Sequence, residues 1–261
     1  MNRTLPLPPD VRLMNLAALL LALLFLAFGA LALGRWISRL RAFDIQAITV
    51  LGDTQHNNSL TLRANVAPRI AGTFFTVDLG RVRSAFETAP WVRRAVVRRD
   101  FPNRLRVTLQ EHVSIALWGG EGELRLVNTF GEVFEANVGE VDQDNLPLLS
   151  GPDGQSADVL AMYRALAPLF APLDLAIDQL ALSGRGSWSV HLATGARVEL
   201  GRGGVDEVRA RAQRFTATLT QVVNRYGRQS AAIESADLRH ENGYAIRLNG
   251  VSTSGADAVP K

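Results

Sequence analysis

The sequence predicts an α+β protein with a single N-terminal transmembrane helix, then a β-α-α-β-β domain, and a distal antiparallel β-domain with flanking helices. Three observations predict this arrangement. A long run near the N-terminus is apolar and uncharged, strand and helix patterns alternate over the next stretch, and many short strands separated by glycines follow. The 261 residues are enough for one or two ordinary domains.

The first element is the predicted transmembrane helix. Leu13 to Leu33 carries no charge, and at about 1.5 Å per residue it reaches about 30 Å, the thickness of a bilayer core. A cleaved signal peptide is the alternative, with Ala30-Leu31-Ala32 as its site, but the run exceeds the usual apolar region of about 7–15 residues. Arginines flank both ends, so counting charges does not fix the orientation and slightly favours an outside N-terminus.

The proximal domain follows from periodicity and turn residues. Apolar residues alternate in the predicted strands and recur every three or four residues in the predicted helices. A turn over residues 100–103 joins the last two strands. In chain order the elements are a strand Phe43 to Leu51, a helix Leu60 to Val66, a helix Leu79 to Ala89, and strands Val92 to Arg99 and Arg104 to Glu111.

Arginines crowd these last two strands. Because Leu105, Val107 and Leu109 alternate with polar residues, the arginines of this strand are expected on its solvent face. Solvent exposure alone explains them, and docking of an acidic partner or of lipid headgroups is a second interpretation. Nucleic acid is the least favoured partner, because no aromatic or lysine residue alternates with these arginines.

The distal region alternates short strands with two helices. The segment LPLLSGPDG, residues 146–154, is interpreted as a turn-rich link, and Val208, Phe215, Leu219 and Val222 as the apolar stripe of the second helix. Glu241-Asn242-Gly243 predicts a hairpin turn. The predicted elements are strands over 114–118, 124–128 and 132–136, a helix Ala157 to Phe170, two or three strands within 181–201, a helix Val205 to Tyr226, and strands over 231–240 and 244–248.

Several classes of chemistry lack support. The chain has no cysteine and a single lysine, Lys261, which excludes thiolate, P-loop lysine and Schiff-base chemistry. Its four histidines do not stand at metal-ligand spacing, and no catalytic motif is present. Gly201 to Gly204 is interpreted as a strand-to-helix turn rather than an anion site. A hydrolase with a dispersed catalytic set stays open as an alternative function.

The charges divide unevenly along the chain. Residues 34–112 carry 13 arginines and 6 acids, a net charge of +7, whereas residues 113–261 carry a net charge of −5. This difference indicates two domains with different surroundings.

Motifs along most of the chain resemble those of the bacterial FtsQ/DivIB cell division family. They are FDIQAITVLG, GTFFTVDL, PWVRRAVVRRDFPNRLRVTLQEH, NTFGEVF, LPLLSGPDG, RGSW, LGRG and DLRH, in that order. The resemblance implies a cytoplasmic tail 1–12, a transmembrane helix 13–33, a POTRA domain 43–112, a β-domain 113–250 and a disordered tail 251–261. It also implies a single-pass inner-membrane protein at the division septum, with its N-terminus cytoplasmic and its bulk periplasmic.

The resemblance further implies a non-enzymatic scaffold without a cofactor. Its partners would be the FtsB–FtsL pair, bound by strand addition to the last strand of the β-domain, and other division proteins through the POTRA and transmembrane parts. The implied partner-binding residues are Arg185, Arg239, His240, Asn242, Tyr244 and Leu248. At positions 240 and 248 the family has tyrosine and tryptophan. Possible docking residues on the POTRA domain are Arg98, Arg104 and Arg106.

Overall fold

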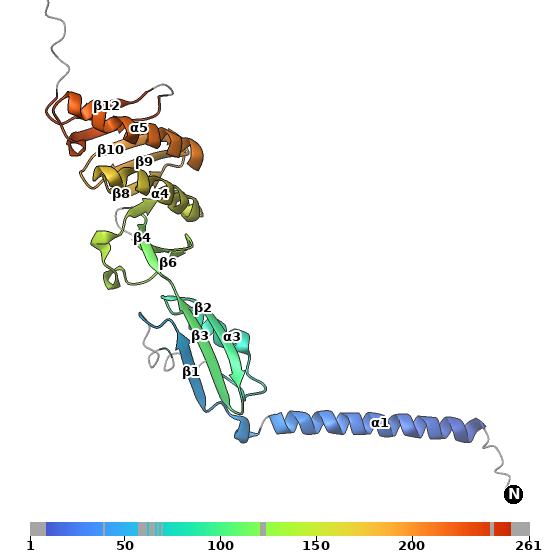
Figure 1. The fold of residues 1–261 in the computed structure, drawn as a ribbon. Coiled ribbons are helices and arrows are strands. Elements are labelled where there is room, and N and C mark those ends of the chain that lie inside the picture. Colours follow the sequence, from blue (N-terminus) through green and yellow to red (C-terminus); the bar gives the residue numbers. More distant parts are fainter. Residues whose placement is uncertain are drawn as a thin grey trace, which may run out of the picture. The chain divides into compact units, whose positions relative to one another are not determined.

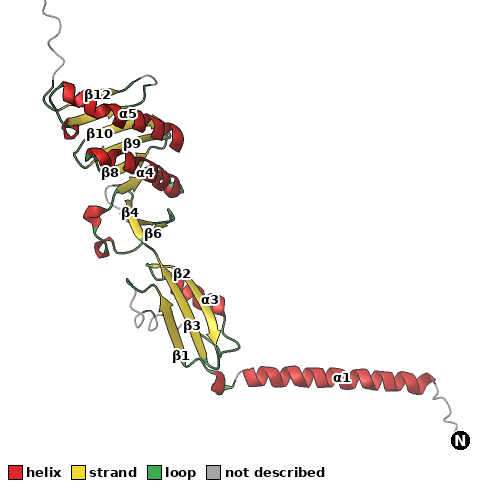
Figure 2. Ribbon diagram, viewed as in Figure 1, coloured by secondary structure: helices red, strands yellow, loops and turns green. Residues whose placement is uncertain are grey.

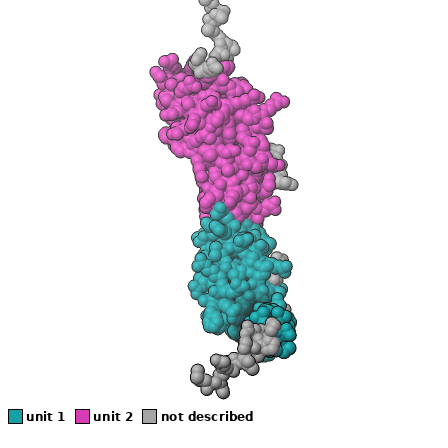
Figure 3. All heavy atoms as spheres, turned by 90° about the vertical axis from the view of Figure 1, so that its right-hand side faces the viewer, with its two compact units in different colours: residues 1–111 teal, residues 112–261 magenta. Residues whose placement is uncertain are grey.

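The structure is a computed structural model that describes residues 9–38, 40–56, 62, 66, 68, 70–120, 124–240 and 243–251. The chain divides into two compact units, residues 1–111 and 112–261 (Figure 3). Several predictions fall outside the described residues: most of the tail 1–12, most of the helix Leu60 to Val66, Asn242, and nearly all of the tail 251–261.

The N-terminal helix forms as predicted. α1 spans Pro9–Ser38, and its segment Leu13–Ser38 has a mean hydropathy of 2.8 with none of its most apolar window buried in the protein. Within the part of the chain described, it is the one helix long and apolar enough to cross a membrane.

After α1, the first unit contains a three-stranded sheet with the helix α3 packed against it (Figure 1). Its elements are η1 Arg41–Phe43, β1 Ala47–Gly52, α3 Leu79–Glu87, β2 Val92–Asp100 and β3 Arg104–Glu111. The strand order is β1-β3-β2, with β1 parallel and β2 antiparallel to the central β3. Leu62 and Val66 are helical and buried where the sequence predicts the first helix.

The first strand begins four residues later than predicted. Arg41 to Phe43 forms a 3₁₀ turn, and Asp44 pairs with Thr73 in an isolated bridge, so the ladder with β3 starts only at Ala47.

Alternation in β3 creates the core of this unit. Its residues are exposed and buried in turn, and Leu105, Val107 and Leu109 pack with Val82 and Phe86 of α3. Asp78 caps this helix, because its Oδ1 accepts hydrogen bonds from the N–H groups of Gly80 and Arg81.

The second unit is built on a mixed nine-stranded sheet. Its strand order is β12-β11-β10-β9-β8-β7-β4-β5-β6. The strands are β4 Ser114–Trp118, β5 Arg125–Asn128, β6 Val133–Phe134, β7 Leu148–Ser150, β8 Ile177–Leu182, β9 Ser187–Leu192, β10 Arg197–Arg202, β11 Ile233–Asp237 and β12 Ala245–Leu248. The helices are η3 Val138–Glu140, η4 Gln143–Asn145, α4 Ser156–Phe170, η5 Ala171–Leu173, α5 Val205–Arg225 and η6 Ser230–Ala232.

The α+β class is confirmed, but this sheet is not wholly antiparallel. The pairs β4–β7, β7–β8 and β10–β11 are parallel. The predicted link LPLLSGPDG is wrong in its first half, since Leu148 to Ser150 forms β7 between β4 and β8. Three residues between Pro147 and Gly151 are too few to show strand periodicity.

The two long helices pack against the sheet and against each other (Figure 2). α4 contacts β7 and β8, and α5 contacts β10. The buried stripe of α5 ends at Val223 rather than at the predicted Val222. Val223 follows Leu219 by four residues, about one helical turn, and therefore lies on the same buried face.

Candidate functional site

Within the described residues, the last strand leaves one row of backbone groups without a partner strand. β12 is the terminal strand of the sheet order, and in this part of the chain it pairs with β11 alone. The N–H of Leu238 donates to the carbonyl of Glu199 at 2.8 Å, so the groups of Asp237, one residue earlier, point the other way, toward β12. Asp237 faces Ala245 in the register. The N–H and C=O of the next residue, Ile246, therefore point out of the sheet edge.

The sheet face away from the helices is polar beside this edge. On β9, the buried Trp188, Val190 and Leu192 alternate with half-exposed Ser187, Ser189 and His191. The register aligns two rows across the strands, in which every residue except the two alanines is polar or charged: Gln179, His191, Arg197, Ser235 and Arg247, then Ala181, Ser189, Glu199, Asp237 and Ala245. The edge is therefore flanked by charged and hydroxyl side chains.

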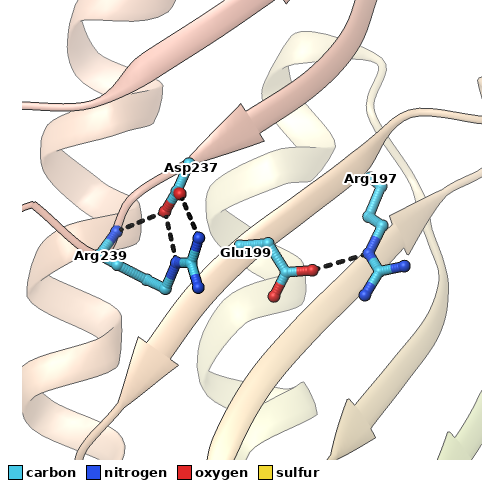
Figure 4. A network of polar contacts seen from close by, with 4 residues as sticks. All are labelled: Arg197, Glu199, Asp237 and Arg239. Atoms are coloured by element: carbon cyan, nitrogen blue, oxygen red, sulfur yellow. Dashed lines mark hydrogen bonds and ion pairs between the residues drawn. The ribbon is translucent and has the colours of Figure 1, made fainter.

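Three of these charged side chains, Arg197, Glu199 and Asp237, form a network with Arg239, drawn in Figure 4. The Arg239 guanidinium donates from Nε to Asp237 Oδ1 at 2.9 Å and from Nη2 to Asp237 Oδ2 at 2.6 Å. The backbone N–H of Arg239 also donates to Asp237 Oδ1 at 3.0 Å. Beside this fork, Arg197 Nε donates to Glu199 Oε1 at 2.7 Å.

The electrostatics follow from this fork. The side-chain hydrogen bond from Arg239 lowers the pKa of Asp237 to about 2, although burial acts in the opposite direction. The same bond raises the pKa of Arg239, with Glu199 adding to the effect. Among the described residues, the bonds to Asp237 use Nε and one Nη2 hydrogen of a guanidinium with five donors, so Arg239 retains donors for a second carboxylate.

A shallow groove of about 330 Å³ runs over this region. Its lining includes Arg197, Glu199, Asp237 and, from the edge strand, Ala245 and Arg247. Arg247 also pairs with Glu234 of β11 at 3.1 Å. An extended segment added at β12 would lie beside this groove, within reach of acidic and basic side chains.

Arg185 and Arg239 lie at the same end of the sheet. Arg185 is exposed in the turn between β8 and β9. Ser187, at the start of β9, pairs with Arg202 at the end of β10. A Cβ placed on Gly201 of β10 would meet Arg239 Cγ at 3.0 Å. The structure therefore brings the two arginines predicted from the sequence to neighbouring strand ends.

His240 and Tyr244 lie on the other side, along α5. Both line a second groove of about 560 Å³ together with Arg211, Arg214 and Thr218. The hydroxyl groups of Tyr244 and Thr218 are hydrogen-bonded at 2.9 Å, and the Tyr244 ring packs edge-on against Phe215 at 5.0 Å. Tyr244 thus fixes the edge strand to the helix.

Leu248 differs from the expectation for a contact side chain. It is 5% exposed and belongs to the core of the second unit, so only its backbone is accessible at the edge. Asn242 lies outside the described residues.

Arg104 and Arg106 are on the solvent face of β3, as predicted, and Arg98 of β2 is exposed beside them. Arg98 faces Arg106 across β2 and β3, and Arg106 Nη2 contacts Asp100 Oδ2 at 3.1 Å. Arg104 is exposed at the start of β3. Arg99, which was not singled out, donates to the carbonyl oxygens of Phe74 and Val77 and so holds a turn in place.

Sequence reasoning missed the acids of the network. Asp237 and Glu199 each stand two residues from an arginine, in the segments D-L-R and R-V-E. On a strand this spacing places both charges on one face. Among the described residues, no group of three or more histidine or acidic side chains is arranged to hold a metal ion.

Comparison with known sequences identifies both units. The C-terminal model of the cell division protein FtsQ/DivIB family matches residues 116–239, and the FtsQ-type POTRA model matches residues 43–112. A cell division protein FtsQ from Burkholderia pseudomallei is 44% identical over 93% of this chain and 94% of its own length. Relatives of the same name from Thiomonas arsenitoxydans and Bordetella pertussis are each 39% identical, over 95% and 92% of this chain and 91% and 92% of their own lengths. The chain therefore belongs to the FtsQ/DivIB family of cell division proteins.

Proposed function

We propose that this chain is a bitopic scaffold of the bacterial division machinery, which binds the periplasmic parts of the FtsB–FtsL pair by strand addition at β12. The observation that carries the proposal is the edge of the nine-stranded sheet beside a polar groove, an edge that no strand of the described residues covers. Membership of the FtsQ family supports the division role. Backbone pairing at the edge would supply affinity, and the charged face beside it would supply specificity.

Arg239 is the proposed anchor for a partner carboxylate. Its guanidinium is held in place by Asp237, so less side-chain freedom is lost when a second acid binds. Its side chain is still 59% exposed and retains free donors. Arg185 would receive a second acid at the same end of the sheet.

A titration of the segment Phe43 to Lys261 with the periplasmic FtsB–FtsL pair tests the anchor. We expect Arg239→Glu to weaken binding about tenfold or more, because it removes the donors and repels an acidic partner. Arg209→Glu is the matched control, since Arg209 is exposed on α5 away from the edge. Equal affinity of the two variants would remove Arg239 from the interface.

The backbone contribution needs a separate variant. Ile246→Pro removes an N–H that points out of the edge without removing a bond to β11, so the fold should tolerate it. Ile246→Val keeps the N–H and controls for the side chain. We expect binding to be lost in the proline variant alone. Binding that survives Ile246→Pro would argue against strand addition at β12.

We also propose the topology and domain roles that the family resemblance implies. The tail 1–12 would be cytoplasmic, the helix would cross the inner membrane, and the POTRA domain 43–112 and β-domain 113–250 would lie in the periplasm at the septum, with residues 251–261 as a disordered tail. Other division proteins would contact the POTRA and transmembrane parts, with Arg98, Arg104 and Arg106 as docking candidates. Protease accessibility of the two ends in spheroplasts would test the orientation.

The proposed scaffold is not an enzyme and uses no cofactor. Two of the four histidines already make structural contacts: His56 stacks on Trp91 at 3.8 Å, and His112 stacks on Phe134 at 4.1 Å. Labelling of the purified chain by a serine-directed probe would favour a hydrolase instead.

A further inference from the structure

We propose that one end of the POTRA domain rests on the phospholipid bilayer, with Phe75 and Phe101 at the headgroup level and Arg41 and Arg104 facing lipid phosphates. This inference rests on the membrane anchor of the proposed function. It concerns an end of the POTRA domain, which lies in a different unit from β12, and of the three docking arginines on the β2–β3 face it uses only Arg104.

The topology of the sheet identifies this end. In the strand register, Ala47 at the start of β1 lies opposite Arg104 at the start of β3. Asp100 at the end of β2 lies opposite the same residue on the other side of β3. The Gln46 N–H donates to the carbonyl of Asn103 at 2.9 Å. The turn 101–103 therefore lies beside the residues through which the chain enters from α1 (Figure 1).

The chain is short between the helix and this end. α1 ends at Ser38, and Phe43 follows five residues later. Even a fully extended segment of that length spans only about 17 Å. The interfacial layer on each side of a bilayer is itself about 5–8 Å thick. A membrane-spanning α1 therefore keeps this end of the domain within reach of the headgroups.

An aromatic cluster occupies this end. Phe74 is buried and makes edge-on contacts with the rings of Phe75 at 5.2 Å and Phe101 at 6.1 Å, while Phe75 meets Phe43 at 4.9 Å. Phe101 is 75% exposed and Phe75 is 48% exposed. Neighbouring exposed phenylalanines on a small domain mark a contact site, and rings beside a transmembrane helix suit the interface.

The cluster is held rigidly. Arg99 Nε donates to the Phe74 carbonyl at 2.6 Å, and Arg99 Nη2 donates to the Val77 carbonyl at 2.9 Å. The Phe74 N–H donates to the Phe43 carbonyl at 2.7 Å. These bonds join the β2 strand, the turn 73–77 and the segment after α1, so the exposed rings are presented in one orientation.

The charges at this end favour phosphate. Arg41 and Arg104 are exposed, and within the described residues neither makes an ion pair. Asp44 is an exposed acid at this end, whereas Asp100 already pairs with Arg106, and the exposed Asp78 pairs with Arg81. Arginine binds phosphate oxygens in a bidentate manner. An apolar pair of rings bordered by arginines is thus complementary to the lipid interface.

The absence of cysteine makes a direct test possible. The full-length chain would carry a single Phe101→Cys or Phe75→Cys change, and the cysteine would be labelled with a fluorophore. The labelled protein would be placed in phospholipid nanodiscs whose lipid headgroups carry a spin label that quenches nearby fluorophores. Leu51→Cys is the matched control, because Leu51 is 46% exposed at the opposite end of β1, about 13 Å further along the strand. We expect several-fold stronger quenching at positions 75 and 101 than at 51, and less quenching at 101 after Arg41→Glu/Arg104→Glu.

Equal quenching at all three positions would overturn the proposal. So would a label at 101 that is shielded from water yet not quenched by lipid, because that pattern indicates a protein partner or a second copy. Using two labelled positions guards against a single variant that fails to fold. Incorporation into nanodiscs tests whether α1 anchors the chain in a membrane, and titration with FtsB–FtsL tests partner binding at β12. The proposed function and this inference can therefore fail separately.

Discussion

The Asp237–Arg239 fork predicts a carboxyl group whose titration depends on one arginine. In the protein as it stands the pKa of Asp237 is about 2, compared with 3.8 for an unperturbed aspartate, and the first cause is the hydrogen bond from Arg239. We expect Arg239→Ala to return this pKa most of the way to 3.8. Arg239→Lys keeps the charge but not the two-bond fork, so in this variant the pKa of Asp237 should lie between that of the unchanged protein and that of Arg239→Ala.

The sign of the pH effect follows from the lowered pKa. A carboxyl group that is more acidic in the folded state stabilises the fold above pH 3.8, and this contribution is lost as the pH falls through about 2. Arg239 is more than half exposed, and water and salt screen such pairs, so the pH dependence of the melting temperature should be small. The pKa itself, rather than stability, is the sensitive measurement.

Carboxyl-carbon NMR of the labelled protein would follow the titration of Asp237. Asp178 is a control aspartate within the same spectrum, since it lies on another strand, β8. An unchanged pKa of Asp237 in Arg239→Ala would refute the hydrogen-bond explanation. A bound partner carboxylate that draws the guanidinium away from Asp237 should also raise this pKa, whereas one that uses the remaining donors should leave it low.

Three further predictions concern the structure around the sites. Glu111 accepts hydrogen bonds from the backbone N–H groups of Gln55 and His56, so Glu111→Ala should destabilise the first unit by about 1–3 kcal/mol for each bond lost. Urea unfolding would contradict this if the alanine variant lost no more stability than Glu111→Gln. Gly201→Ala should cost about 1–2 kcal/mol, since Gly201 has a φ of +81° and a Cβ would press on Arg239; unchanged stability and an unchanged Asp237 pKa would count against it. Arg99→Ala should lose about 1 kcal/mol for each of its two bonds and speed amide exchange in the turn 73–77, and full protection there would show that the arginine is not its support.

Local periodicity was enough to predict most of the elements. The alternation of Leu105, Val107 and Leu109 in β3 and the apolar spacing in α3 and α5 each match the structure, because a half-buried strand and an amphipathic helix reveal themselves within one segment. β7 was missed because its three residues gain strand geometry only from parallel neighbours far away in the chain. The mixed character of the sheet depends on the same long-range pairing.

The candidate site shows the same limit. The two-residue spacing in D-L-R and R-V-E is enough to predict the ion pairs Asp237–Arg239 and Arg197–Glu199. Only the register between β10 and β11, in which Glu199 faces Asp237, brings the two pairs together. Tyr244 and Leu248 were expected as contact side chains because the family resemblance implies them. Strand alternation turns both toward α5, so that one braces the edge and the other fills the core.

The burial of Leu248 and the position of His240 change how partner binding would be distributed. The resemblance assigns aromatic side chains to these positions in the family, and large rings are common anchors of interfaces. Here one position is buried and the other lines the groove along α5. Strand addition does not require either ring, because Ile246 still presents its N–H and C=O outward whatever side chain stands two residues later. The interface of this chain should therefore depend more on the backbone of β12 and on Arg239 than on aromatic contacts. A partner matched to it should carry a carboxylate near the end of the sheet where Arg185 and Arg239 lie.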